Sequence, residues 1–373
     1  MYNLCMSMIK ELISNFWQKY ERPLLLVAAI GGFIFDLFLA KRPDSIADNI
    51  LLVSYLFIVG ALIVLLNIHE KNVTAEGGAM IAPMWTLLIM QFCFGGLANN
   101  LLILYGKSGT LGGDLVFIGF LAAFALGNEY LKTKYGQLRF NVAVYYFLLL
   151  TYLVMAVPTF VMHTIGTQVF LISGAASLVF IALFLRMLYR VVLRGQPGAH
   201  RKLYEVSGIV LLIFALFNVL YFTNIIPPVP LSLKSIGIYH TVTRTADGNY
   251  SATLEPSPWY IFWRDTSATY TWATGESATC FSAVFAPAEL FTPIYQRWEY
   301  FYPTTGDWIT VAHVQFPISG GRAQGYRGFT TKTKLEAGQW RCDVETASGQ
   351  LIGRISFDVV ESSSTPTLSS VTL

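Results

Sequence analysis

Long runs of apolar residues limit what this chain can fold into more than any other feature of its sequence. A helix needs about 20 such residues to cross the hydrocarbon core of a bilayer. Only 13% of the residues are charged, against roughly 25% in soluble domains. We therefore predict a helical membrane bundle of seven spans, namely Leu24–Ala40, Ile50–Leu66, Met80–Leu102, Leu111–Leu126, Phe140–Val161, Gln168–Leu188 and Val206–Ile225.

Residues 1–22 precede these spans and have a different pattern. Apolar residues recur every three or four positions from Cys5 to Tyr20, with polar residues between them. This spacing predicts an amphipathic helix. Such a helix fits the membrane interface, and packing against the bundle is the alternative.

The basic residues beside the spans predict the orientation of the chain. Lys and Arg gather on the cytoplasmic side of membrane proteins. Four of them flank one side, namely Lys41, Arg42, Lys107 and Lys234, and twelve flank the other, namely Lys10, Lys19, Arg22, Lys71, Lys132, Lys134, Arg139, Arg186, Arg190, Arg194, Arg201 and Lys202. We expect a cytoplasmic N-terminus and, with seven crossings, a C-terminal domain outside the cytoplasm.

Polar residues within or beside the spans are candidates for transport or catalysis. Asp36, Glu129, Glu205 and His163 all lie near predicted helix ends, where a charge also reaches water easily. Asn99 and Asn100 fall inside the third span. A coupled transporter would need several acids deep in the bilayer, and the spans do not contain them.

Beyond Pro230 the pattern changes to the alternation of β-strands. In "GQWRCDVE" and "GRISFDVV" apolar and polar residues alternate, and "TASGQLI" between them favours a hairpin. We predict a small antiparallel, immunoglobulin-like β-sandwich over residues 231–360, after a membrane domain over 23–226 and before a disordered tail over 361–373. Further strands are expected at Ser235–Arg244, Ala278–Phe285, Tyr295–Tyr302, Trp308–Phe316 and Gly328–Leu335.

Two of the four cysteines, Cys280 and Cys342, fall on predicted strands of this domain. Outside the cytoplasm they would meet oxidising conditions. The sequence leaves two states open, a disulfide between the sheets or two buried thiols, because their distance is unknown.

The stretch "GGRAQGYRGF" is rich in glycine and arginine. It lacks the spacing and the strand–helix context of a nucleotide-binding loop. A tight connection between strands, with glycines at positive φ, is one interpretation. The other is a site for an anion, a sugar or a protein partner, for which the candidate residues are Gly320, Gly321, Arg322, Gly325, Tyr326, Arg327 and Trp298.

Chemical motifs are missing from the rest of the sequence. There is no GxSxG or HExxH motif and no Cys/His cluster. The net charge of +3 is too small to argue for nucleic acid. We therefore expect no catalytic residues, no metal and no cofactor.

Three segments of the C-terminal part carry a family resemblance. "CFSAVFAPAELFTPIYQRWEYF", "GGRAQGYRGFTTKTKL" and "GQWRCDVETASGQLIGRISFDVV" resemble a family of uncharacterised bacterial multi-pass membrane proteins whose C-terminal domain has no known function. The chain departs from the family pattern at Phe285, where arginine is usual, and at Cys342, where valine is usual. The resemblance implies this fold and a bacterial origin but supplies no activity. With the orientation predicted above, we expect an inner-membrane protein with a periplasmic β-domain.

These observations favour a non-enzymatic protein whose periplasmic domain binds an envelope protein or glycan, with the lipid bilayer as its other partner. A transporter or channel, with Asp36, Asn99 and Asn100 as polar contacts, is the alternative. An enzyme acting on lipid-linked sugars through Asp36, Glu129 or His163 has the least support, because no cluster of acids occurs.

Overall fold

The computed structural model describes residues 44–75, 84–108, 116–119, 121, 138–258, 261, 266–273, 275–287, 290–319, 325–362 and 366–373. The chain forms two compact units. We call them the helical unit (Met1–Leu104, Phe117–Val154 and Ile172–Val219) and the β unit (Tyr105–Val116, Met155–Leu171 and Leu220–Leu373).

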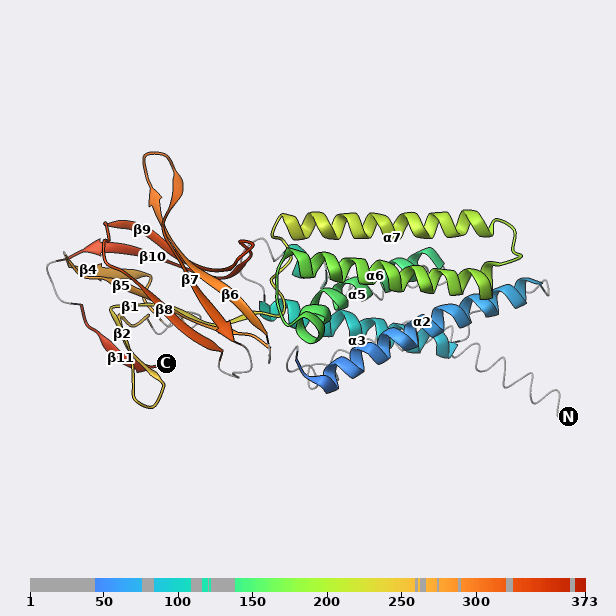
Figure 1. Cartoon of the computed structure of the whole chain (residues 1–373), viewed down its shortest axis with the longest axis horizontal. Helices are drawn as coiled ribbons and strands as arrows, with labels where there is room; N and C mark the ends of the chain where they lie inside the picture. Colours follow the sequence, from blue (N-terminus) through green and yellow to red (C-terminus); the bar gives the residue numbers. More distant parts are fainter. Residues whose placement is uncertain are drawn as a thin grey trace. The chain divides into compact units, whose positions relative to one another are not determined.

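Five long apolar helices precede the strands (Figure 1). Two of them, α5 and α6, continue into one π-helical turn each, η2 and η3. All five are long and apolar enough to cross a membrane. Their bounds are α2 Ile46–Ala75, α3 Met84–Ser108, α5 Leu138–Val157 with η2 Pro158–Met162, α6 Thr167–Leu188 with η3 Tyr189–Leu193, and α7 Ala199–Phe222.

The count of candidate spans in the described residues is five, and our expectation of seven is corrected to that number. The predicted first span, Leu24–Ala40, and the interfacial helix over residues 1–22 lie outside the described residues. The predicted fourth span is described only at residues 116–119 and 121. The other five predicted spans each coincide with one of the long helices.

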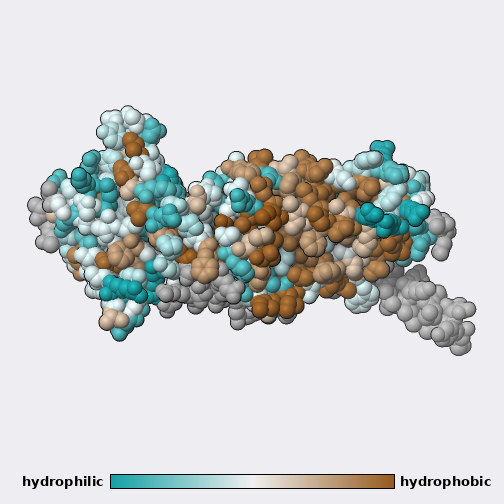
Figure 2. Space-filling model, viewed as in Figure 1, coloured by the Kyte–Doolittle hydropathy of each residue, from teal (hydrophilic) through white to brown (hydrophobic). Residues whose placement is uncertain are grey.

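Large apolar side chains remain exposed along these helices. On α7, Leu212 is 69% and Leu216 is 52% exposed, and on α6 Leu183 is 60% exposed. Figure 2 shows hydrophobic residues gathered over the helices. A water-soluble domain rarely exposes so large an apolar surface, so lipid is the solvent that suits these helices.

Small residues and polar pairs join the helices to one another. A Cβ atom on Gly174 of α6 would lie 3.0 Å from the Phe214 ring of α7, so glycine permits this close approach. The hydroxyl of Tyr146 on α5 lies 3.2 Å from the Ser177 hydroxyl on α6. Tyr152 of α5 donates to the Asn49 amide oxygen of α2 at 3.3 Å.

The β unit contains eleven described strands in three sheets (Figure 1). The orders are β1-β5-β8, β4-β10-β9-β6-β7 and β11-β3-β2. Their bounds are β1 Ser232–Tyr239, β2 Thr241–Arg244, β3 Tyr250–Leu254, β4 Thr269–Trp272, β5 Ala278–Phe285, β6 Phe291–Tyr302, β7 Asp307–Ser319, β8 Tyr326–Lys332, β9 Gly338–Thr346, β10 Leu351–Glu361 and β11 Ser369–Thr372.

A disulfide between Cys280 of β5 and Cys342 of β9 links the first sheet to the second across a shared core. Trp298 of β6 lies opposite Cys342 in register and is 1% exposed. A buried tryptophan against an inter-sheet disulfide is typical of immunoglobulin domains. The β unit therefore resembles an immunoglobulin-like fold.

Most predicted strands agree with this architecture, and β5 has the predicted bounds Ala278–Phe285. The predicted strand Ser235–Arg244 is instead divided into β1 and β2, which belong to different sheets. The predicted hairpin is the antiparallel pair β9–β10. Three short strands, β3, β4 and β11, were not predicted.

Two details of the predicted sandwich are wrong. Residues 369–372, expected to be disordered, form β11, because they complete backbone hydrogen bonds with β3. The sandwich is also not purely antiparallel, because β4 pairs with β10 in parallel.

Removing the disulfide should destabilise the β unit measurably. The bond spans 62 residues of sequence, and a loop of that size corresponds to about 4 kcal/mol of chain entropy in the unfolded state. We expect Cys280→Ala with Cys342→Ala to lower the free energy of unfolding by up to about 4 kcal/mol in denaturant titrations of the detergent-solubilised protein.

The control is Cys93→Ala, in α3. A thiol reductant should lower the free energy of unfolding of this variant as much as that of the unmodified protein. The double variant should not respond to the reductant. An unmodified protein whose unfolding is indifferent to reductant would contradict the structural role given to this bond.

Candidate functional site

The glycine-rich connection between β7 and β8 is only partly described. Gly320, Gly321 and Arg322 lie outside the described residues. Gly325 has φ +83°, and a Cβ atom there would come within 2.9 Å of the Val284 backbone. Both constraints require glycine. Gly325 therefore has a structural reason to be glycine, and the role of the stretch in binding stays a prediction.

Arg327 is the described arginine of this stretch. Its guanidinium donates to the Leu373 backbone oxygen at 3.1 Å and to the Asn249 side-chain oxygen at 3.2 Å. These bonds join β8 to the end of β11 and to the β2–β3 turn. Tyr326 is half-buried beside it and packs against the core cluster around Val284. Both side chains have structural contacts within the β unit.

Trp298 lies inside the sandwich, in the core cluster with the disulfide. It is 1% exposed, and its indole nitrogen donates to the Thr330 hydroxyl at 2.8 Å. Trp340, on the neighbouring strand β9, is 3% exposed. Both indole rings belong to the core.

Of the polar candidates in the membrane part, some lie outside the described residues and others are buried within a helix. Asp36 and Glu129 lie outside the described residues. Asn99 and Asn100 are both 1% exposed within α3, and Asn100 donates to the Gly96 carbonyl one turn earlier at 2.9 Å. A bond to the preceding turn is a common way for a polar side chain to satisfy itself inside a helix.

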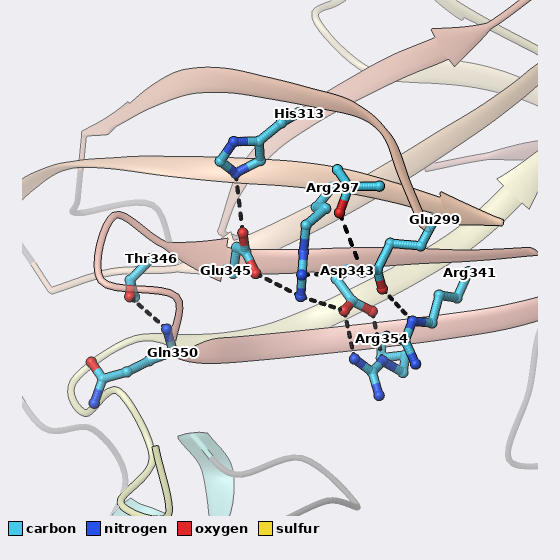
Figure 3. Close-up of polar contacts among 10 residues, drawn as sticks. Arg297, Glu299, His313, Arg341, Asp343, Glu345, Thr346, Gln350 and Arg354 are labelled. Atoms are coloured by element: carbon cyan, nitrogen blue, oxygen red, sulfur yellow. Dashed lines mark hydrogen bonds and ion pairs between the residues drawn. The ribbon is translucent and has the colours of Figure 1, made fainter. Parts of the chain in front are cut away.

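A charged network that the sequence analysis did not foresee covers the outer face of the second sheet (Figure 3). Its members come from neighbouring strands that lie in register, with Arg297 of β6 opposite Asp343 of β9. We define the outer-face network as Arg297, Glu299, His313, Arg341, Asp343, Glu345 and Arg354.

Arg297 is the centre of the network. Its terminal nitrogens lie 3.1 Å from carboxylate oxygens of Glu299, Asp343 and Glu345. All three acids are nearly inaccessible to water, with side-chain exposures of 4%, 0% and 8%. Burial of a carboxylate is costly unless it is paired and hydrogen-bonded.

Two further arginines complete the pairing. Arg354 binds both Asp343 oxygens at 2.6 Å, the two-pronged geometry that suits a guanidinium and a carboxylate. Arg341 pairs with Glu299, and its guanidinium lies 4.2 Å from the centre of the Trp308 ring on β7. Three arginines therefore balance three acids.

Burial raises the pKa of the Glu345 carboxyl above its usual range, although Arg297 and His313 act against that shift. The ring nitrogen Nε2 of His313 lies 3.0 Å from Glu345, and this histidine side chain is 47% exposed. His313 therefore connects the network to solvent at the edge of the sheet.

The network is suited to holding β6, β7, β9 and β10 rigidly rather than to binding a ligand. Its formal charges cancel when His313 is neutral. The described residues contain no group of three or more His, Cys, Asp and Glu side chains that fits a metal ion. The alternation in "GQWRCDVE" correctly predicts that Arg341, Asp343 and Glu345 share one face of the strand. Their ion-pair partners depend on which strands lie beside β9, and a local pattern does not reveal those neighbours.

Strand β7 is an exposed edge. In the described part of the chain it pairs with β6 alone and ends the order of its sheet. It is 13 residues long, and the apolar side chains of Ile309, Val311 and Val314 are 45%, 39% and 41% exposed. Tyr302, at the end of β6, adds a further exposed ring.

Comparison with known proteins places this surface in a domain without an assigned activity. Residues 292–359, from β6 to β10, match the family described as "Protein of unknown function (DUF2914)". The chain thus has a C-terminal DUF2914 domain behind an N-terminal region of apolar helices. No curated protein matches the chain.

Solved structures give only weak likenesses. An immunoglobulin-like protein from Pseudomonas aeruginosa is 14% identical, over 35% of this chain and 96% of that one, with a TM-score of 0.20. A β-glucosidase from Listeria innocua is 13% identical, over 26% and 15%, with a TM-score of 0.19. An alkylpurine DNA glycosylase from Pseudomonas fluorescens is 12% identical, over 86% and 99%, with a TM-score of 0.22. These scores are too low to carry an argument.

The raised pKa of Glu345 predicts a specific pH dependence. A carboxyl whose pKa is higher in the folded state favours folding when protonated. Its stabilising effect is complete below the ordinary glutamate pKa of about 4.3 and is lost as the pH rises through the raised value. Relative to Glu345→Gln, the unmodified protein should therefore lose stability over this interval.

The measurement is the free energy of unfolding of the solubilised protein at several pH values. Glu361→Gln, at the exposed end of β10, removes the same charge without touching the network and should not reproduce the effect. A difference between the unmodified protein and Glu345→Gln that stays constant with pH would contradict the assignment.

Proposed function

We propose that this chain is a bacterial inner-membrane protein that presents its β unit to the periplasm and binds an extended segment of an envelope protein along β7. The edge of β7 carries the proposal, because no second strand pairs with it among the residues that the structure describes. An edge strand offers free backbone N–H and C=O groups to which another strand can add.

The length and side chains of β7 fit this role. Its 13 residues exceed those of the other strands at the ends of the three described sheets. Proteins usually blunt long edges with charges or cover them. Here Ile309, Val311 and Val314 leave an apolar edge, and hydrophobic side chains are visible on the β6–β7 hairpin in Figure 2.

The outer-face network supports binding at the edge rather than on the face. Docking on Arg297 or Arg354 would compete with carboxylates already bound at short distance. Truncating such a pair leaves a buried charge, which is strongly unfavourable. Instead the network links β6 and β7 to β9, so that the edge is already formed when a partner arrives.

The periplasmic location has two supports. The Cys280–Cys342 bond suits an oxidising compartment. The excess of Lys and Arg on one set of helix ends favours a cytoplasmic location for that set. Among the described helices, Arg190, Arg194 and Arg201 lie at those ends.

Placing a lysine on the edge should weaken partner binding. We expect Val314→Lys to reduce capture of an envelope protein by at least several fold, because a charge on an edge strand disfavours strand addition. Capture is measured by photo-crosslinking from a probe at Ile309, followed by mass spectrometry.

The matched control is Val360→Lys, an equally apolar and exposed position, 48% accessible, on β10 away from the edge. This variant should crosslink as the unmodified protein does. Equal losses in both variants, or crosslinks only to lipid, would contradict strand addition at β7.

Topology can be tested separately by thiol labelling. With Cys5 and Cys93 replaced by serine, a cysteine at Asp247 in the β2–β3 turn should react with an impermeant maleimide in intact spheroplasts. A cysteine at Pro197, between η3 and α7, should react only after permeabilisation. The opposite pattern would place the β unit in the cytoplasm.

A further inference from the structure

The helical unit contains a cavity of about 370 Å³ between the ends of its helices. One part of its wall is apolar, and the other is polar and charged. Cavities of this size accommodate small ligands. The lining residues are Asn67, Glu70, Leu138, Arg139, Val192, Leu193, Gln196, Lys202 and Val206.

The cavity lies where the candidate membrane spans end. The spans that contribute to it end at Asn72 and Leu193 and begin at Leu138 and Ala199. Tyr204, two residues beyond Lys202, is 76% exposed, and exposed aromatic residues gather at the level of the lipid headgroups. The cavity is therefore positioned at a membrane–water boundary.

Cations dominate the polar part of the wall. Arg139 forms an ion pair with Glu205, which Arg201 also contacts at 3.1 Å. Lys202 donates to the amide oxygen of Gln196 at 3.4 Å, a weak bond to a group without charge. Among the lining residues Arg139 and Lys202 are the two cations and Glu70 is the one acid, so the cations exceed the acids by one.

A buried amide completes the lining. Asn67 of α2 is 6% exposed and donates one N–H to the Ile63 carbonyl at 2.7 Å. An amide has a second N–H and an oxygen that can accept. The cavity therefore offers donors of several kinds to an anion, next to apolar walls.

We propose that this cavity binds the headgroup of an anionic phospholipid, with the phosphodiester near Lys202 and Arg139. Basic pockets between helices at the headgroup level suit such lipids. Val192, Leu193 and Val206 supply apolar contacts for the glycerol and the first part of the acyl chains. Soluble phosphate shares the anion but gains nothing from these apolar walls.

The test uses the full-length protein in detergent, with retained lipid counted by native mass spectrometry. The probes are phosphatidylglycerol, zwitterionic phosphatidylcholine and inorganic phosphate. We expect phosphatidylglycerol to be retained in preference, and Lys202→Gln to weaken its apparent Kd about fivefold, since one basic residue near a membrane contributes about that factor.

Arg190→Gln is the matched control, because it removes an exposed cation that does not line the cavity. Its effect should be clearly smaller.

Equal losses in both variants would reduce the effect to general surface charge and overturn the site. Equal retention of both lipids would also overturn it, and displacement by millimolar phosphate would assign the site to a soluble anion instead. Lys202 is exposed, so its substitution leaves the fold intact, which circular dichroism checks.

Discussion

The β unit depends on the contact of one guanidinium, that of Arg297, with three buried carboxylates. Glu299, Asp343 and Glu345 each lie 3.1 Å from it. Loss of one partner from a buried ion pair typically costs about 3–5 kcal/mol. The two strands that supply these groups, β6 and β9, must therefore keep their register, or a charge would be left without its counter-ion.

The network and the disulfide act on opposite faces of the same strand. Along β9, Asp343 and Glu345 point to the outer face, and Cys342 and Val344 point into the core. Cys342 joins β9 to β5, while Asp343 joins it to β6 and β10. A strand held from both sides has little freedom to shift its register, since a one-residue shift would exchange its two faces.

Much of this architecture follows from local sequence pattern, and the failures have physical causes. Apolar length predicts the five described apolar helices, and alternation predicts long strands such as β9 and β10. Strands β3, β4 and β11 have four or five residues and many Ser and Thr, so their own pattern is weak. Their pairing partners stabilise them, and partners are not visible in a local pattern.

The candidate sites are less predictable, because they arise where distant segments meet. Alternation places Arg341 and Asp343 on a polar face, which suggests solvent, yet Asp343 is fully buried under Arg297 and Arg354. Trp298 has the residue type of a sugar-binding aromatic but faces the core. In the sequence Lys202 resembles the other basic residues at the helix ends. The cavity beside it forms only where the ends of several helices meet in the folded chain.

Arg354 in the β unit and Lys202 in the helical unit have opposite electrostatic surroundings. In the β unit the charges of Arg297 and Arg354 are balanced by acids at 2.6–3.1 Å, so little attraction remains for an outside ligand. In the helical unit Lys202 meets a neutral amide, and its field extends into the cavity. Unbalanced charge attracts mobile anions, whereas balanced and buried charge gives rigidity. Recognition by the β unit is therefore expected from the unused backbone groups of β7, and recognition by the helical unit from charge.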